Sequence, residues 1–197
     1  MLAVAGCDSD DGEGKPAADG PGVVAPGKPG EPARTLTAEE ASKEIVEDTP
    51  NSADYRYVQM MIKHHEQALV MTGLVPDRAS SASVKSLAGR ISAGQQPEIA
   101  AMQGWQKNHD ADRHVVEHDH AAMPGMATAA QLDALRAARG KEFDRLFLTL
   151  MIAHHQGAVT MATEALSEGN NVLVEEMATD VAAQQTVEAD RMRALLD

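Results

Sequence analysis

Two adjacent histidine pairs, each flanked by methionines, are the most distinctive chemical feature of this sequence. Both pairs stand in a Met-Ile-x-His-His pattern with a further methionine downstream. Imidazole nitrogen and thioether sulfur form a soft to borderline ligand set, which favours copper, above all Cu(I), over magnesium or calcium. We therefore predict a copper site, with zinc bound through His and Glu as the alternative. The predicted metal ligands are Met61, His64, His65, Met71, Met151, His154, His155 and Met161.

The histidine pairs belong to an internal repeat. Residues 54–74 can be laid over residues 144–164 without a gap, and the same register continues into the next segment of each half. There Gln95, Glu98 and Met102 recur as Gln185, Glu188 and Met192. Because the spacing agrees across two segments, we predict two similar structural halves, at about residues 53–107 and 141–197.

Helical periodicity places the candidate ligands on one face of an element in each half. Met61, His64, Ala68 and Met71 are three or four residues apart, which is the spacing of neighbours on one side of an α-helix. The same spacing recurs from Met151 to Met161. Each histidine pair is therefore expected to point into the protein interior.

Capping and turn signals give the extent of the elements. Short helices are expected after Thr37 and Thr128, each of which begins a capping-box pattern. Long helices are predicted from residues 51–52 to just before Pro76, over 83–107, over 141–166, and from 172 to the C-terminus. The predicted fold class is all-α, a four-helix bundle built from two repeated helical hairpins.

Two polar residues interrupt the apolar stripe of the second helix of each half. They are Gln95 and Glu98 in the first half and Gln185 and Glu188 in the second. Buried polar side chains are costly unless they are paired, and the histidines of the neighbouring helices are the obvious partners. A glutamate that faces a histidine orients the imidazole and raises its basicity, as is usual around metal ligands. We predict that these four residues contact the histidine ligands and orient them, without binding the metal themselves.

A purely structural interpretation uses the same residues. Histidines with Gln and Glu neighbours can form a satisfied polar network that fixes helix register, while methionines fill irregular space in a core. The duplication of both pairs with methionine one turn away favours metal binding.

The connection between the halves, residues 108–127, is a second candidate metal site. Tracts rich in His and Met commonly bind metals. The candidate ligands here are His114, His118, His120, Met123 and Met126. A solvated acidic loop with clustered histidines is the alternative, because a flexible loop imposes no geometry on its side chains.

The N-terminal residues predict a lipid anchor and a tether. Val4-Ala5-Gly6-Cys7 resembles the site at which a bacterial signal peptidase cuts before a lipidated cysteine, so Cys7 is the predicted lipidation site. Residues 8–34 are mainly Gly, Pro, Ala, Asp and Glu, the composition of a disordered linker. We divide the chain into a signal remnant with a disordered tether, residues 1–34, and a folded domain, residues 35–197. The protein is expected to be exported and lipid-anchored to the outer face of the cell membrane.

Composition excludes several classes of partner and site. The formal net charge of −13 gives no general attraction to nucleic acid, which is not an expected partner. The single cysteine excludes sites made of several cysteines, so a metal must be held by His, Met and carboxylates. No stretch approaches the roughly 20 apolar residues that a membrane-spanning helix needs.

The motifs resemble those of the domain-of-unknown-function 305 family. The segments MMIKHHEQALVM and FDRLFLTLMIAHHQGAVTMA, with MPGM ahead of the second, carry the resemblance, which covers about residues 53–196. It implies a ferritin-like fold, export, and copper sequestration or transfer outside the cytoplasm. The eight His and Met residues named above match the family's motif positions, and Met123 and Met126 match its M-x-G-M element. The fourth helix departs from the commoner pattern at Thr186, Val187 and Asp190.

Three functions fit these observations. The leading hypothesis is a metal-binding protein, not an enzyme, that buffers, sequesters or passes on Cu(I). A ferritin-like di-metal oxidase is the enzymatic alternative, but such sites require Glu-x-x-His on two helices, and the His-bearing segments lack it. The third is a structural bundle that binds no metal. The expected partner is the metal ion, and the membrane is contacted only through the lipid anchor.

Overall fold

The computed structural model describes residues 22–27, 30–44, 48–109 and 123–196. The chain divides into two compact units, Met1–Glu47 and Asp48–Asp197. The sequence predicted a boundary after residue 34, whereas the structure has it after residue 47. The difference arises because helix α1 (Ala38–Glu44) contacts the two strands of the first unit.

The first unit contains a small antiparallel sheet. Strand β1 (Val23–Ala25) pairs with β2 (Arg34–Leu36), and Val23 lies opposite Leu36. This corrects the prediction of an unstructured tether up to residue 34 and adds strands to the predicted all-α fold. β-branched residues favour strands, and Gly30, at φ +91°, adopts the left-handed conformation that a reversal needs. The Thr37 capping box of α1 is confirmed, since the Thr37 and Glu40 amides donate to the partner's side-chain oxygen at 2.9 and 3.2 Å.

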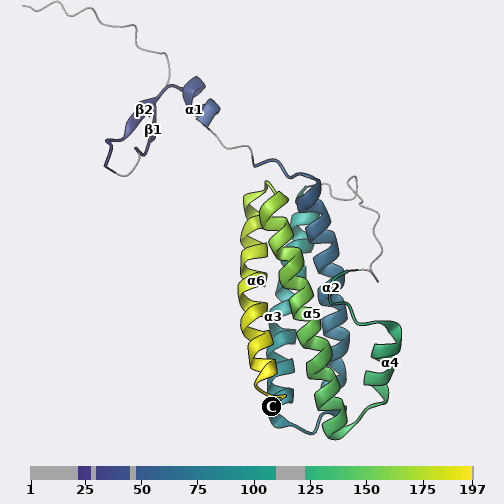
Figure 1. Cartoon of the computed structure of the whole chain (residues 1–197). Coiled ribbons are helices and arrows are strands. Elements are labelled where there is room, and N and C mark those ends of the chain that lie inside the picture. The colour runs from purple at the N-terminus through teal and green to yellow at the C-terminus, as the bar shows by residue number, and fades with distance from the viewer. Residues whose placement is uncertain (1–21, 28–29, 45–47, 110–122, 197) are drawn as a thin grey trace, which may run out of the picture. The chain divides into compact units, whose positions relative to one another are not determined.

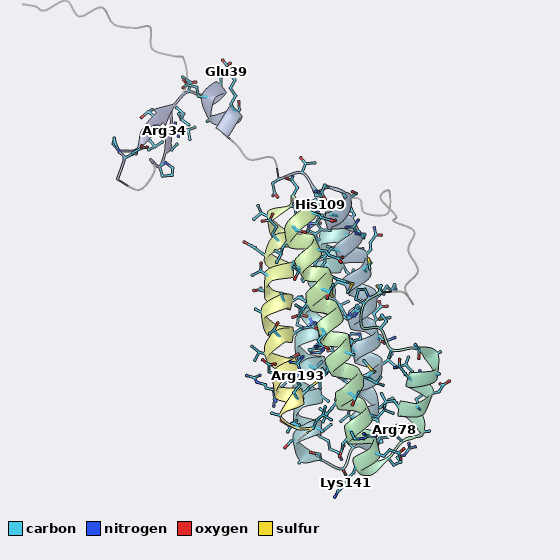
Figure 2. All side chains as sticks on the ribbon, viewed as in Figure 1. Arg34, Glu39, Arg78, His109, Lys141 and Arg193 are labelled. Carbon is cyan, nitrogen blue, oxygen red and sulfur yellow. The ribbon has the colours of Figure 1, made fainter. Side chains whose placement is uncertain are left out.

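Four long helices of the second unit lie side by side (Figure 1). They are α2 (Ser52–Arg78), α3 (Ala82–Asn108), α5 (Gly140–Glu168) and α6 (Val172–Arg193). Helix α2 packs against α3 and α5, α5 packs against α6, and the short α4 (Ala129–Ala137) contacts α2 and α5. Figure 2 places His109 and Lys141 at opposite ends of these helices. The mainly helical fold is confirmed, and within the described residues no helix is long and apolar enough to cross a bilayer.

The predicted helix ends hold within a few residues except at Pro76. Helix α2 continues through this proline to Arg78, although proline lacks the amide that would donate to the preceding turn. Val75 and Ala79 are buried, and the Ala79 amide donates to the Val75 carbonyl at 3.0 Å. Packing of the last turn therefore outweighs the lost hydrogen bond.

Side-chain caps begin the helices where the sequence predicted them. At the start of α2 the Asn51 side chain accepts from the amides of Ala53 and Asp54, and Asp54 accepts from the Asn51 amide. Thr128 and Gln131 form the same reciprocal pair at α4, which confirms the predicted capping box. These bonds satisfy amides that have no partner within the helix.

Two equivalent aspartates connect each hairpin to the turn of the other. Asp54 of α2 accepts hydrogen bonds from the amides of Asn170 and Asn171, in the turn between α5 and α6. Asp144 of α5 accepts from the amides of Ser80 and Ser81, in the turn between α2 and α3. Both aspartates are buried, so neither turn is stabilised by its own hairpin alone.

The apolar interior consists of two clusters that lie on either side of the histidine pairs along α2 and α5. One contains Met71, Leu87, Phe143, Phe147 and Met151 among its members, and the other contains Tyr57, Met61, Met102, Trp105 and Met161. All four methionines predicted as ligands are buried. The histidines thus occupy a polar layer between two hydrophobic ones.

The buried Asp144 carboxylate should be essential for the second unit's stability. Replacing Asp144 with Ala leaves the Ser80 and Ser81 amides without their acceptor, and we expect a loss of about 1–3 kcal/mol in the free energy of unfolding. Urea unfolding followed by circular dichroism measures it. The control is Asp133→Ala, because Asp133 is exposed and pairs with Arg136 on the surface. Equal stability of the two variants would contradict the structural role.

Candidate metal centre

The two histidine pairs meet in the interior of the second unit. Helices α2 and α5 run antiparallel, as the ion pair between Arg56 and Glu168 at 2.6 Å requires. This brings the His64 and His154 rings into contact, with ring centroids 3.7 Å apart and an interplanar angle of 32°. His64, His65, His154 and His155 are all fully buried. The structure therefore brings together the histidines that the sequence singled out.

The outer histidine of each pair contacts a glutamate on the adjacent helix. His65 Nε2 lies 2.7 Å from Glu98 Oε2, and His155 Nε2 lies 2.8 Å from Glu188 Oε2. A carboxylate accepts, so the Nε2 atom carries the proton in these pairs. In a neutral imidazole the other nitrogen, Nδ1, then presents a lone pair. The expected contacts of both glutamates with histidines of the neighbouring helices are thus present, and their role in supporting metal ligands stays a prediction.

His64 also donates a hydrogen bond from Nε2, but to a different kind of partner. Its Nε2 lies 3.0 Å from the Pro124 carbonyl oxygen, which can only accept a hydrogen bond. The Nδ1 atom of His64 is therefore also the acceptor of a neutral ring. In these three imidazoles Nε2 is therefore the donor, and Nδ1 is the nitrogen without a hydrogen-bond partner.

Buried nitrogen and oxygen atoms without hydrogen-bond partners are concentrated around these rings. Within the part of the chain that the structure describes, they comprise Nδ1 of all four histidines, Nε2 of His154, both amide atoms of Gln95 and Gln185, and the hydroxyl of Tyr57. Each such atom costs roughly 1–3 kcal/mol when it is left unpaired. The expected pairing of the glutamines with the histidines is not seen. A bound cation would turn the unpaired lone pairs into ligands.

Burial keeps the central histidines neutral. It lowers the pKa of His64 to about 3, and the neighbouring His65 and His155 act in the same direction. Burial, followed by the adjacent His64, also lowers the pKa of His154 well below its ordinary value. A neutral imidazole is the form that binds metals, so both rings are ready to do so at physiological pH.

The histidines do not by themselves complete a coordination sphere. Across the described ranges, no group of three or more His, Cys, Asp or Glu side chains is arranged to hold a metal ion. To hold a metal ion, His64 and His154 would need other donors or a shift of the outer rings. The thioethers of the flanking methionines and the amides of Gln95 and Gln185 are the other donors available, and this mixed set fits a soft cation best.

A short segment that begins at Met123, before α4, closes over His64. Pro124 supplies the carbonyl that His64 contacts, and the Gln67 side chain bonds both the amide and the carbonyl of Ala127, at 2.7 and 3.0 Å. A Cβ on Gly157 would lie 1.9 Å from the Pro124 oxygen, so α5 needs a glycine there. The sequence analysis predicted neither the Pro124 contact nor the need for a glycine at position 157. A glycine in the middle of a predicted helix was the signal that could have indicated them.

The predicted loop site is only partly described. Met123 is buried in the core and Met126 packs against it, on the same side of the histidines as Met61 and Met161. His114, His118 and His120 lie outside the described residues, as does Cys7. The loop site and the lipidation site stay predictions.

The family of this chain follows from comparison with known sequences. The profile of the domain of unknown function DUF305 matches residues 54–196. The chain belongs to the DUF305 family. This confirms the resemblance carried by the histidine and methionine motifs. No curated protein matches the sequence.

Solved DUF305 structures share the fold. A protein from Streptomyces coelicolor, inferred to be secreted, is 30% identical over 73% of this chain and 91% of its own, with a TM-score of 0.68. A DUF305 fragment from Deinococcus radiodurans is 31% identical over 73% of this chain and 95% of its own, with a TM-score of 0.67. CopM in its Cu(I)-bound form is 29% identical over 72% of this chain and 94% of its own, with a TM-score of 0.60. CopM has also been solved with Cu(II) and with silver.

Because Gly157 contacts Pro124, replacing it with alanine should change stability in the direction opposite to that expected from helix propensity alone. Alanine in place of an exposed helical glycine ordinarily stabilises a helix by up to about 1 kcal/mol. Gly157→Ala should instead destabilise the protein, because its Cβ would collide with the Pro124 carbonyl. Gly73→Ala is the control, since nothing lies within 4 Å of the added Cβ on α2. Thermal unfolding of both variants measures the difference, and stabilisation by both would contradict the contact.

Proposed function

We propose that this DUF305 protein is an exported copper-binding protein that holds Cu(I) between its two histidine pairs. The observation that carries the proposal is the set of buried, unpaired imidazole nitrogens where α2 meets α5. A core that only needed filling would be more stable with leucine at these positions, because apolar replacements of buried unpaired polar groups are neutral or stabilising. The arrangement is explained by a ligand that uses the lone pairs.

Three features support copper as the ion. The neutral nitrogens and nearby thioethers are a soft to borderline donor set, which suits Cu(I). CopM, similar along most of both chains, has been solved with Cu(I), Cu(II) and silver bound. The site also lies between two methionine-containing clusters, with Met61 and Met161 on one side and Met71 and Met151 on the other. Zinc, bound by histidine with glutamate, is the competing ion.

The position of the glutamates favours binding over oxygen chemistry. Glu98 and Glu188 each contact the outer nitrogen of a histidine, where they orient the ring. Di-metal oxidases of ferritin-like proteins instead take their glutamates as metal ligands, together with Glu-x-x-His motifs. We therefore propose a role in buffering, sequestering or passing on copper, in a duplicated, ferritin-like four-helix bundle.

The cellular location belongs to the same proposal. The Val-Ala-Gly-Cys sequence before residue 8 favours a lipid anchor at Cys7, and the similar Streptomyces coelicolor protein is inferred to be secreted. A copper-binding unit at the outer face of the membrane would meet the metal before it enters the cell. The formal charge of −13 suits a cation as the partner.

Replacing His154 with Leu should lower the affinity for Cu(I) and raise the stability of the metal-free protein. In His154→Leu, two buried nitrogens without partners are replaced by hydrocarbon, so the metal-free protein should gain up to about 1–3 kcal/mol in the free energy of unfolding. Its affinity for Cu(I) should fall at least about tenfold, or ~1.4 kcal/mol. Competition with a chromophoric Cu(I) chelator and urea unfolding measure the two quantities.

The matched control is His109→Leu. His109 is not one of the candidate ligands of the connection, and it stacks on Trp105 at the end of α3, far along the helix from Glu98. Its replacement should leave the Cu(I) affinity of the histidine layer unchanged. A His154→Leu variant that binds Cu(I) as tightly as the unmodified chain would remove the histidine layer as the site. The stability gain also separates ligand loss from unfolding, which would lower both quantities.

X-ray absorption of the Cu(I)-loaded protein should detect both nitrogen and sulfur around the metal. The reason is that imidazole alone leaves the coordination sphere incomplete in this geometry, and thioethers lie in the layers on either side. A sphere of nitrogen alone would exclude Met61, Met71, Met151 and Met161 as ligands. The four methionines can then be replaced singly with leucine to find which of them supply the sulfur.

A further inference from the structure

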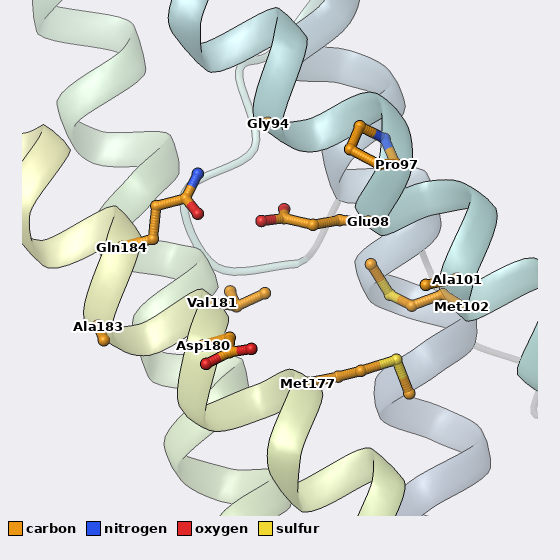
Figure 3. A pocket seen from close by; sticks show the side chains of 10 residues that line it. All are labelled: Gly94, Pro97, Glu98, Ala101, Met102, Met177, Asp180, Val181, Ala183 and Gln184. Carbon is orange, nitrogen blue, oxygen red and sulfur yellow. The ribbon is translucent and has the colours of Figure 1, made fainter.

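A groove lies between α3 and α6 (Figure 3). It has a volume of about 640 Å³, and its lining includes Gly94, Glu98, Ala101, Met102, Met177 and Ala183. Glycine and alanine on facing helices leave this space, because larger residues would fill it. The groove is open to solvent, and of its lining residues Glu98 also makes one of the histidine contacts described above.

Glu98 connects the groove to the buried imidazoles. Its carboxylate lies in the groove wall, and its Oε2 atom is 2.7 Å from His65 Nε2. The Glu98 side chain is 23% exposed, whereas the equivalent Glu188 side chain is 8% exposed. A single hydrogen bond thus connects the partly exposed Glu98 carboxylate to the fully buried His65 ring. The equivalent Glu188 carboxylate is less accessible to solvent than that of Glu98.

The repeat is broken at this end of the bundle by residues that can interact with a cation. Met177 occupies the position that Leu87 has in the other half, and Tyr57 occupies that of Phe147. The Tyr57 hydroxyl is buried without a hydrogen-bond partner in the described part of the chain, close enough to Glu98 for the two to interact electrostatically. The equivalent positions at the other end carry only hydrocarbon.

Two thioethers and two carboxylates face the space between the helices. In Figure 3 the side chains of Met102 and Met177 extend from α3 and α6 into the groove, and Asp180 lies one turn from Met177. Met102 is almost fully buried, while Met177 is partly exposed. The two thioether side chains therefore lie at different depths, with Met177 nearer the surface and Met102 nearer the core.

We propose that this groove is the route by which Cu(I) enters and leaves the histidine layer, with Met177 and Met102 as transient ligands. The carboxylates of Glu98 and Asp180 attract the cation, the thioethers bind it without a change of oxidation state, and Glu98 gives up its contact with His65 as the ion passes. This inference rests on the proposed copper-binding function and adds the path that the ion takes.

The test measures the rate of copper transfer separately from affinity. The full chain loaded with Cu(I) is mixed with excess bicinchoninate, and the coloured complex is followed by stopped flow. Ala101→Leu combined with Ala183→Leu fills the groove from both helices without touching a histidine. We expect the release rate to fall about tenfold or more, equivalent to ~1.4 kcal/mol in the barrier, at unchanged stoichiometry and affinity.

Two controls make the result specific. Ala100→Leu adds the same side chain to an exposed position of α3 that does not line the groove, and it should leave the rate unchanged. Met177→Leu, which copies Leu87 of the other half, should slow release severalfold, whereas Met60→Leu on α2 should not. Circular dichroism of each variant confirms that the helices are retained.

The possible failures differ. If the filled and Met177→Leu variants release copper as fast as the unmodified chain while binding it fully, the groove is not the route, and the histidine site stands. If the unmodified chain binds no Cu(I), both the route and the proposed function are overturned.

Discussion

The removal of four imidazoles from water is the constraint to which the rest of this structure responds. Burial keeps the central rings neutral, and neutrality leaves each ring with one donor and one acceptor. Glu98, Glu188 and the Pro124 carbonyl accept from three of the donors, so the acceptors of those rings share one interior layer. The hydrophobic clusters above and below exclude water from that layer. A ligand-ready site and an incompletely satisfied core are therefore the same feature.

Much of this arrangement could be predicted from residue types and their spacing. The repeat fixed which histidines, glutamates and methionines are equivalent, and helical periodicity put them on inward faces, where they lie. The Pro124 carbonyl could not be predicted, because its contact with His64 depends on the path of a connection rather than on a helical period. The strand at residues 23–25 was missed because its surroundings, rich in glycine and proline, have the composition of a linker. The prediction that α2 ends before Pro76 was wrong, because the packing of Val75 and Ala79 in the core cannot be read from the sequence.

The two halves preserve the histidine–glutamate contacts but differ in what surrounds them. Gln67 holds the segment at Ala127 in the first half, whereas its equivalent Gly157 makes room for Pro124 in the second. Met177 and Leu87 differ in the same way, as do Tyr57 and Phe147. The two halves therefore resemble each other in the histidine layer and differ at the two ends of the interior. This difference fits the proposed route for the ion, which uses one end only.

The exchange of aspartate caps between hairpins makes the two hairpins depend on each other. Asp54 and Asp144 each satisfy the turn of the opposite hairpin, so every hairpin carries both a capping carboxylate and a turn that needs one. Such a unit is self-complementary, and two separate hairpins related by a twofold axis would make the same contacts as the two halves of this chain. Separate hairpins would form the histidine layer only as a dimer, at a yield that depends on protein concentration. The covalent connection between the hairpins removes that dependence.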